Sequence, residues 1–118
     1  MSRKTSDGQV LKGLLDTLVL DVLCRGDDYG FGILQKIGGY LEDGHGVFKE
    51  QTIYPLLHRL EANGYVESYH RPGNRGTPRK YYRITEPGRA RLAERTSQWR
   101  QIADLLAKTI LKPQTASG

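Results

Sequence analysis

Cysteine, tryptophan and methionine each occur once in this chain of 118 residues, and phenylalanine occurs twice. A single cysteine excludes an intrachain disulfide. The histidines His45, His58 and His70 have no His, Cys or acidic neighbour at a metal-ligand spacing. No glycine-rich loop has the spacing of a phosphate cradle, and no nucleophile has a recognisable base partner. The sequence therefore predicts no metal site, no cofactor and no enzymatic activity.

Long hydrophobic runs are also absent, because no stretch approaches the roughly 20 apolar residues that a bilayer-spanning helix needs. The first ten residues, MSRKTSDGQV, lack the apolar core of a secretory signal. We therefore expect a cytoplasmic protein without a membrane partner. The length predicts one domain with a small core. Cys24 lies in an apolar run, which favours a small buried hydrophobic residue over a redox sensor.

The sequence does contain positive charge, and it is concentrated in one segment. The formal net charge is +5, with 18 basic and 13 acidic residues. Residues 65–91 alone hold seven basic and two acidic side chains, which accounts for the whole excess. Concentrated positive charge is typical of a surface that binds phosphate groups. The alternative is a solvated basic segment that only improves solubility, but the helix pattern before it favours phosphate binding.

Apolar residues at three- and four-residue steps predict helices in the first half of the chain. The expected order is a loose polar segment over 1–9, a largely buried helix over 10–23 and a shorter helix over 29–37. Gly30 and Gly32 would let the second helix approach the first closely. The pair Gly38-Gly39 predicts a frayed end or kink, and a loop is expected over 42–50.

A third helix and a basic hairpin follow. The helix is marked by apolar residues at Ile53, Leu56, Leu57 and Leu60. With Thr52 as N-cap, Pro55 would occupy the third helical position, where no internal N–H bond is lost. Asn63-Gly64 is the stop signal. Two aromatic-rich strands are predicted over 66–71 and 80–85, joined by a long turn rich in Gly and Pro.

The last predicted element is a long helix over 86–111, with Thr85 as N-cap and Pro87 in its first turn. A loose tail is expected over 112–118. The whole order predicts an α+β, mostly α fold. It is a winged helix-turn-helix over 10–85, made of three helices and a two-stranded β-hairpin wing, followed by a long C-terminal dimerisation helix.

Four segments of the chain resemble one known family, in the same order. LKGLLDTLVLDVL, YGFGILQKI, QTIYPLLHRLEANGYV and RGTPRKYYRITEPGRARL closely resemble the PadR family of bacterial transcriptional regulators. The resemblance covers residues 11–92, and the single long C-terminal helix resembles the short subfamily. It implies a homodimer that represses transcription by occupying a promoter. The Gly38-Gly39 pair and the loop EDGHGVFKE depart from the more helical segment that the family has there.

The start of the third helix carries polar side chains suited to the major groove of double-stranded DNA. Gln51 can pair with adenine, whereas Tyr54 either reaches DNA or packs against the second helix. Arg59 either reaches a phosphate or pairs with Glu50 or Glu61. The predicted DNA contacts are Lys49, Gln51, Thr52, Tyr54, His58, Arg59, Arg75, Thr77, Arg79 and Lys80. The last four lie in the wing, where basic side chains suit phosphates or the minor groove.

The C-terminal helix carries an apolar stripe at alternating steps of four and three residues, as in a coiled-coil seam. The stripe consists of Leu92, Thr96, Trp99, Ala103, Leu106 and Ile110. A second copy of the chain is the simplest partner, with Val10, Leu11 and Leu14 of the first helix sharing the interface. Two recognition helices one DNA turn apart predict a palindromic operator.

Trp99, the only tryptophan, has two interpretations. It either anchors the interface between two copies or forms a flat wall for an effector. The resemblance supports the second interpretation, because in family members that bind planar drugs a tryptophan at the matching place stacks on the ligand. Thr96 and Ala103, one turn to either side, are small enough to leave space for a small planar or aromatic effector.

Other classes of binding protein stay open as alternatives. A winged helix can serve as a module for protein–protein interaction, or bind nucleic acid non-specifically without effector control. The basic hairpin argues against the protein-binding module. The chain lacks the aromatic sheet motif typical of RNA binding, although Tyr81-Tyr82 on a strand keep RNA as an alternative. We expect a cytoplasmic, nucleoid-associated regulator of transcription.

Overall fold

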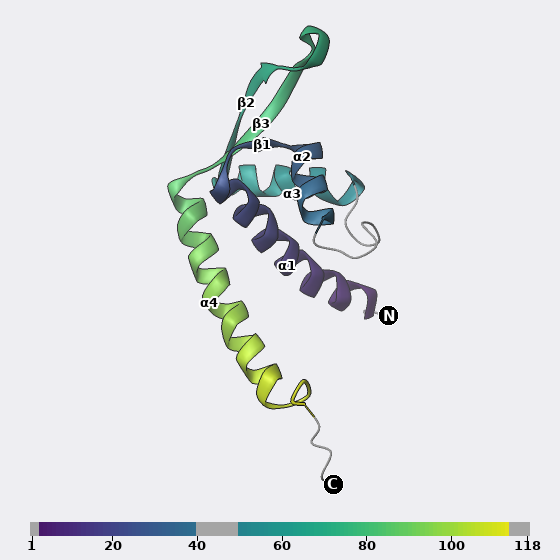
Figure 1. The fold of residues 1–118 in the computed structure, drawn as a ribbon, viewed down its shortest axis with the longest axis vertical. Helices are drawn as coiled ribbons and strands as arrows, with labels where there is room; N and C mark the ends of the chain where they lie inside the picture. The colour runs from purple at the N-terminus through teal and green to yellow at the C-terminus, as the bar shows by residue number, and fades with distance from the viewer. Residues whose placement is uncertain (1–2, 40–49, 114–118) are drawn as a thin grey trace.

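The computed structural model describes residues 3–39 and 50–113, with side chains from residue 13 onward except that of Asn74. Helices α1, α2 and α3 form a body from which a hairpin projects, and α4 runs away from it in the opposite direction (Figure 1). The elements are α1 Arg3–Arg25, β1 Asp28–Tyr29, α2 Gly30–Gly38, α3 Glu50–Ala62, β2 Val66–Pro72, a 3-10 turn Asn74–Gly76, β3 Pro78–Ile84 and α4 Glu86–Lys108. This order confirms the predicted winged helix-turn-helix with a long C-terminal helix.

The hydrophobic core lies where α1, α2 and α3 meet the inner face of the sheet. The fully buried large side chains are Val19, Leu20, Leu23, Ile33, Ile37, Ile53, Leu57 and Val66. Tyr82 and Ile84 of β3 close the core from the sheet. All four apolar residues that mark α3 are buried. One side of α3 is therefore fixed by packing, which leaves its opposite side free for contacts outside the body.

The sheet has three strands, in the order β1-β3-β2, rather than the two that the sequence predicts. Asp28 pairs with Tyr82 and Tyr29 with Tyr81, both antiparallel. Tyr29 thus belongs to β1 and caps α2 instead of starting it. A two-residue strand is too short to show the alternation that identifies strands. Because β1 joins α1 to α2, this strand hydrogen-bonds the wing to the helical body.

Two helix starts differ from the prediction. α1 begins at Arg3, within the polar segment that was expected to be loose. The helix therefore continues through polar residues beyond its apolar stripe. α3 begins at Glu50, so Thr52 lies inside the helix and the predicted N-cap is wrong. Pro55 is therefore also internal, and having no N–H it cannot donate to the carbonyl of Gln51.

Two helix ends agree with the prediction and one does not. α2 ends at Gly38, with Gly39 as C-cap. The rest of the expected loop, up to residue 49, lies outside the described residues. α3 is followed by Gly64 in the left-handed conformation, with φ +80°. α4 ends at Lys108 rather than at Leu111, and the Leu111 amide turns back to the Leu106 carbonyl at 2.8 Å.

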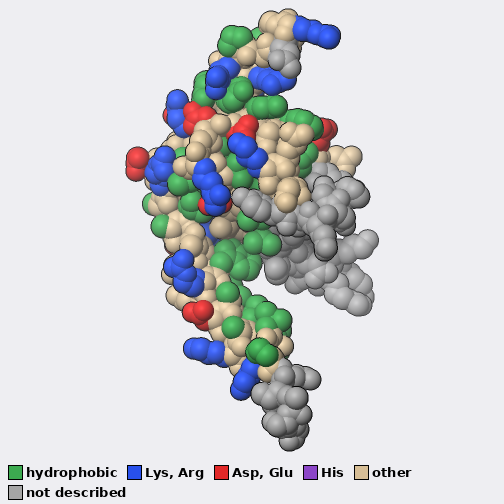
Figure 2. All heavy atoms as spheres, viewed as in Figure 1, with side chains coloured by type: hydrophobic (Ala, Val, Ile, Leu, Met, Phe, Trp, Pro, Cys, Tyr) green, Lys and Arg blue, Asp and Glu red, His purple; other side chains and the backbone are tan. Residues whose placement is uncertain are grey.

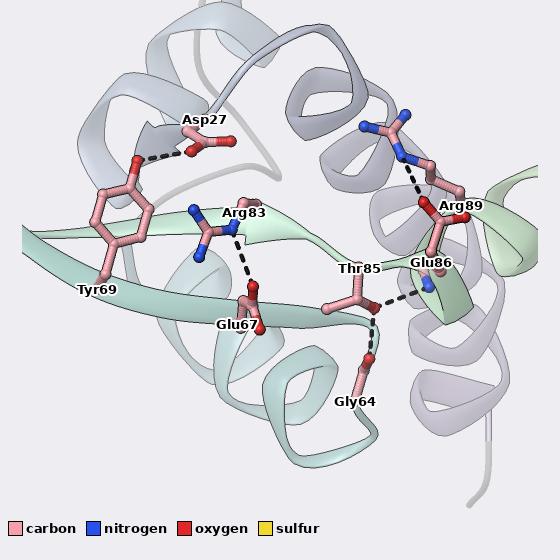
Figure 3. A network of polar contacts seen from close by, with 9 residues as sticks. Asp27, Gly64, Glu67, Tyr69, Arg83, Thr85, Glu86 and Arg89 are labelled. Atoms are coloured by element: carbon pink, nitrogen blue, oxygen red, sulfur yellow. Dashed lines mark hydrogen bonds and ion pairs between the residues drawn. The ribbon is translucent and has the colours of Figure 1, made fainter.

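The two ends of the hairpin meet at Thr85, which caps α4 as predicted (Figure 3). The Thr85 hydroxyl accepts a hydrogen bond from the Gly88 amide at 3.1 Å and donates one to the Gly64 carbonyl at 2.6 Å. The Thr85 amide donates to the Tyr65 carbonyl at 3.0 Å. A Cβ at Gly88 would collide with that same carbonyl. The exit of α3 and the entry of α4 are therefore joined directly.

Cys24 is exposed, so its predicted burial is wrong. Leu20 and Leu23 occupy the buried side of α1, and the next residue turns about 100° around the helix to the outside. There Arg89 Nη1 of α4 donates to Cys24 Sγ at 3.3 Å. Within the described ranges, no helix is both long and apolar enough to cross a membrane.

Candidate nucleic-acid interface

One side of α3 is exposed and polar. Gln51, Tyr54 and His58 recur at three- and four-residue steps and all three are exposed, Tyr54 to 41%. The predicted base- and phosphate-contacting side chains of this helix thus lie on its solvent side. Thr52 is half-buried, and Lys49 lies outside the described residues. The first half of α3 therefore presents a surface that suits the major groove.

Tyr54 is exposed at its rim but packs against the start of α2. A Cβ at Gly30 would lie 2.5 Å from Tyr54 Cε1, so glycine leaves room for the ring. Gly32 leaves room for the Asp28 carboxylate in the same way. The atoms nearest to these two glycines thus belong to Tyr54 and Asp28 and not to α1. Burial, followed by the charge of Glu50, raises the pKa of Tyr54, so its hydroxyl stays a neutral hydrogen-bond donor at pH 7.

A cleft of about 310 Å³ opens between the start of α2, the middle of α3 and strand β3. Tyr54 and His58 line it from α3, Arg79 and Lys80 line it from β3, and Gly30 lies at the N-terminal end of α2. Hydroxyl, imidazole, guanidinium and ammonium groups converge there with the positive end of a helix dipole. The cleft is therefore suited to one phosphodiester group of a DNA backbone.

The tip of the wing is a tight turn that presents an arginine. Arg75 is exposed and has a left-handed backbone, with φ 61° and ψ 27°. The Gly73 amide donates to the Thr77 carbonyl at 2.7 Å, and a Cβ at Gly73 would clash with that oxygen. Lysine and arginine side chains lie along the wing and at its end (Figure 2). The predicted contacts Arg75 and Thr77 are thus both exposed at the tip.

Three tyrosines form a row across the outer face of the sheet, with ring centroids 5.4 Å and 5.9 Å apart. A guanidinium lies 4.5–4.9 Å from the centroid of each ring: Arg71 over Tyr81, Arg79 over Tyr29 and Arg83 over Tyr69. We call these six residues the Tyr–Arg ladder. It ends on Asp27, which accepts a 2.7 Å hydrogen bond from the Tyr69 hydroxyl (Figure 3). Because arginines occupy the ring faces, the ladder is poorly suited to stacking RNA bases.

Arg59 pairs with α1 and not with the glutamates that the sequence suggested. Arg59 Nη2 donates to Asp16 Oδ1 at 2.7 Å. Arg59 follows His58, and one residue turns a side chain about 100° around a helix, from the exposed side towards α1. Glu61 instead accepts a 2.6 Å hydrogen bond from Ser68 and lies 3.7 Å from Lys80 Nζ. Neighbouring residues of α3 thus tie it to α1 on one side and to the wing on the other.

Asp16, which is not among the predicted contacts, is the less exposed partner in this pair. Its side chain is 19% exposed, against 38% for Arg59. Burial raises the pKa of Asp16, while Arg59 and then Arg95 and Arg91 of α4 lower it. The sequence did contain a signal for this ion pair, because an acidic residue within the apolar stripe of a helix needs a basic partner when it is removed from water. Identifying that partner required the packing of α3 on α1.

The predicted stripe on α4 divides into two parts. Leu92 packs against the core, and half-buried Trp99 donates from Nε1 to Thr17 Oγ1 of α1 at 3.2 Å. Beyond Trp99 the apolar side chains lose this cover, since Ile102 is 43%, Leu105 60% and Ile110 79% exposed. Of the other predicted interface residues, Thr96 and Leu106 are half-buried, Ala103 is exposed and Leu14 is 38% exposed. The side chains of Val10 and Leu11 lie outside the described set.

A helix with a polar exposed side, beside a cationic cleft and a basic hairpin, defines a winged-helix regulator of the DNA-binding class. Residues 19–94 match the model of the transcriptional regulator PadR-like family, and the chain belongs to that family.

Solved structures of relatives agree with this assignment. The chain is 35% identical to a transcriptional regulator from Clostridium thermocellum, with a TM-score of 0.74 over 86% of this chain and 98% of that one. It is 27% identical to a PadR-like transcriptional regulator from Bacillus cereus, with a TM-score of 0.75 over 90% and 99% of the two chains. A transcriptional regulator of Mycobacterium tuberculosis is 42% identical over 64 residues, which are 54% of this chain and 55% of that protein.

Proposed function

We propose that this PadR-family protein is a sequence-specific repressor that binds double-stranded DNA as a homodimer. The observation that carries the proposal is the exposed polar side of α3, placed beside the cleft of Tyr54, His58, Arg79 and Lys80. Gln51 would read a base in the major groove. The cleft would bind a backbone phosphate, and Arg75 would follow the adjacent phosphates or minor groove.

Arg59 is left out of this proposed DNA contact set. Its guanidinium is already paired with Asp16, so a phosphate contact would have to compete with a 2.7 Å ion pair. Lys80 remains in the set, because its 3.7 Å distance from Glu61 and 39% exposure leave it able to turn towards DNA. The protein would act in the cytoplasm, on the nucleoid.

The proposed dimer rests on the apolar side chains that the lower half of α4 leaves exposed. Ile102, Leu105, Ile110 and Leu111 are each at least 43% exposed within one chain. Apolar atoms are visible along this part of α4 (Figure 2). Clustered apolar side chains on a terminal helix mark a contact surface, and a second copy gives a closed, two-fold arrangement. Such a dimer would read a palindromic operator in the promoter.

The proposed effector site is centred on Trp99 at that dimer interface. Trp99 is half-buried and held by Thr17, with Thr96 half-buried and Ala103 exposed one turn to either side. A small planar aromatic compound could stack on the indole between the two copies and release the DNA. Titration with planar cationic and phenolic compounds, followed by Trp99 fluorescence, tests this. An unchanged spectrum across the panel would count against an effector.

Fluorescence anisotropy tests the main proposal. Full-length protein is titrated onto the DNA upstream of its own gene and onto a scrambled duplex of equal length, across a salt series. We expect binding to the upstream duplex to be tighter by at least about 1,000-fold, the usual specificity ratio of such regulators. Two chains should bind each site. Equal, weak binding to both duplexes that vanishes with salt would support the alternative, a non-specific nucleic-acid-binding protein.

The second alternative, a protein-interaction module, gives a different result in a simpler assay. A DNA-binding wing should retain the protein on heparin until high salt, because it carries Arg71, Arg75, Arg79, Lys80 and Arg83. Elution at low salt, together with no anisotropy change on either duplex, would favour the protein-interaction module.

A further inference from the structure

Two adjacent residues of α1 contact two different helices. Asp16 accepts a hydrogen bond from Arg59 of α3 at 2.7 Å, and Thr17 accepts one from Trp99 of α4 at 3.2 Å. The Thr17 hydroxyl in turn donates to the Gly13 carbonyl at 2.9 Å, which fixes its orientation on α1. A single turn of α1 thus holds both the helix proposed to read DNA and the helix proposed to form the dimer.

Charged residues of α4 also act on this turn of α1, in addition to the two hydrogen bonds. Asp16 is mostly buried, and the pKa of its carboxyl responds to Arg95 and Arg91 of α4 as well as to Arg59. Arg95 Nε is itself buried, without a hydrogen-bond partner among the described residues. Arg59 of α3 thus pairs directly with this carboxylate, and the positive charges of Arg95 and Arg91 on α4 also act on it.

We propose that Asp16 is a positioning residue for DNA recognition, which sets the orientation of α3 through Arg59 and links it to α4 through Thr17 and Trp99. The proposal rests on the proposed function, in which α3 reads the DNA. A helix moves its neighbouring residues together, because consecutive residues are only about 1.5 Å apart along the axis. A displacement of Trp99, by a partner chain or an effector, would therefore move Asp16 and with it the recognition helix.

The chain offers a matched control on the same helix. Arg25 and Asp21 form an ion pair of similar length, 3.0 Å, but both belong to α1 and the pair is more exposed, at 69% and 39%. An Asp→Asn or Arg→Met change there removes the same groups without touching α3 or α4. Comparing the two pairs separates the proposed link from a general effect of lost charge.

The first experiment needs no DNA. Emission and acrylamide quenching of Trp99, the only tryptophan, are measured in Arg59→Met and in its control Arg25→Met. Arg59→Met should shift the Trp99 emission, because loss of the ion pair releases Asp16 and disturbs the adjacent Thr17. Arg25→Met should leave it unchanged. Thermal unfolding of each variant confirms that the fold is intact, and identical emission in folded Arg59→Met and wild type would overturn the link.

The second experiment measures DNA binding by Asp16→Asn and Asp21→Asn on the upstream and scrambled duplexes. Asp16→Asn should weaken binding to the upstream duplex by about 2- to 30-fold, as expected for a residue that acts through a packing contact, and leave scrambled-duplex binding unchanged. Asp21→Asn should match wild type. Equal affinities for both variants would overturn the positioning role. If wild type does not discriminate between the duplexes, the proposed function fails instead, while the emission experiment still decides the link.

If Asp16→Asn does not fold, Thr17→Val replaces it. This variant keeps the ion pair to Arg59 and removes the hydrogen bond to Trp99. Hydrogen exchange of the α3 amides should become faster in Thr17→Val if α4 acts on α3 through α1. Unchanged exchange in α3, with faster exchange confined to α4, would overturn the link.

Discussion

The wing and the distal half of α4 both extend from the helical body, but they differ in where their contacts are. The wing makes its contacts within one chain: its strands pair over their full length, and each tyrosine of the Tyr–Arg ladder lies under a guanidinium. The distal half of α4 leaves Leu105 and Ile110 at least 60% exposed. The wing therefore makes its packing contacts within the chain, whereas the distal half of α4 has apolar side chains that no other described residue covers.

The largest effect is expected when a charge is placed among the exposed apolar side chains of distal α4. Leu105→Asp should weaken dimerisation by roughly 30-fold or more, since central apolar residues dominate interface energies. Analytical ultracentrifugation measures the change. The control is Ser97→Asp, at an exposed position on the polar side of α4, which should stay dimeric. Equal dimerisation in both variants would show that the partner binds elsewhere.

Removing a proposed base contact should change specificity and leave the fold intact. Gln51 is exposed on α3, so Gln51→Ala should lose roughly 1–3 kcal/mol of discrimination at one base pair. Anisotropy on single-base variants of the operator measures it. An unchanged preference at every position would remove Gln51 from the recognition surface.

The contacts that stabilise the wing within one chain can be tested at Tyr81, the central tyrosine of the Tyr–Arg ladder. Tyr81 contacts two tyrosine rings and Arg71, so Tyr81→Leu should lower the free energy of unfolding by about 1–2 kcal/mol from lost ring and cation–π contacts. Tyr81→Phe keeps the ring and should resemble wild type. Urea unfolding compares the three proteins, and similar loss in both variants would assign the effect to the hydroxyl instead.

The tip of the wing should contribute charge without sequence preference. Arg75→Ala should weaken binding to all duplexes alike and reduce the salt slope by about one, because one phosphate contact is lost. Anisotropy across a salt series on two unrelated duplexes checks this. A loss confined to one duplex would instead make Arg75 a base-reading residue.

The smallest expected effect concerns the stability of the body at acid pH. Burial raises the pKa of Asp16 above its ordinary 3.8, so the fold favours the protonated carboxyl. This stabilisation is complete below 3.8 and is lost as the pH rises through the raised pKa. On acidification from neutral pH, wild type should therefore gain melting temperature relative to Asp16→Asn. A constant difference across the range would contradict this.

The sequence predicted the elements whose signals are local. Apolar spacing located α3 and α4, and Thr85 and Gly64 marked helix ends that the structure confirms. The polar residues at the start of α3 were also found from spacing alone. These features depend on neighbours within one or two turns, which a linear sequence displays directly.

The features that the sequence did not predict depend on packing between distant segments. Strand β1 has two residues and is defined only by its pairing with β3. Arg59 and Asp16 are 43 positions apart, and only the packing of α3 on α1 brings them together. Cys24 follows the buried Leu23, and its own exposure depends on which elements cover that side of α1. The ladder likewise needs the register that places Tyr69 opposite Tyr81.

The closure at Thr85 has a consequence for how relatives of this protein can diversify. Its hydroxyl and amide bind the exit of α3 to the entry of α4, so residues 66–84 form an insertion whose two ends are already joined. Lengthening, shortening or exchanging that insertion at its tip leaves the geometry between α3 and α4 unchanged. Wing length and charge can therefore vary as an independent module, while α4 keeps its place relative to α3.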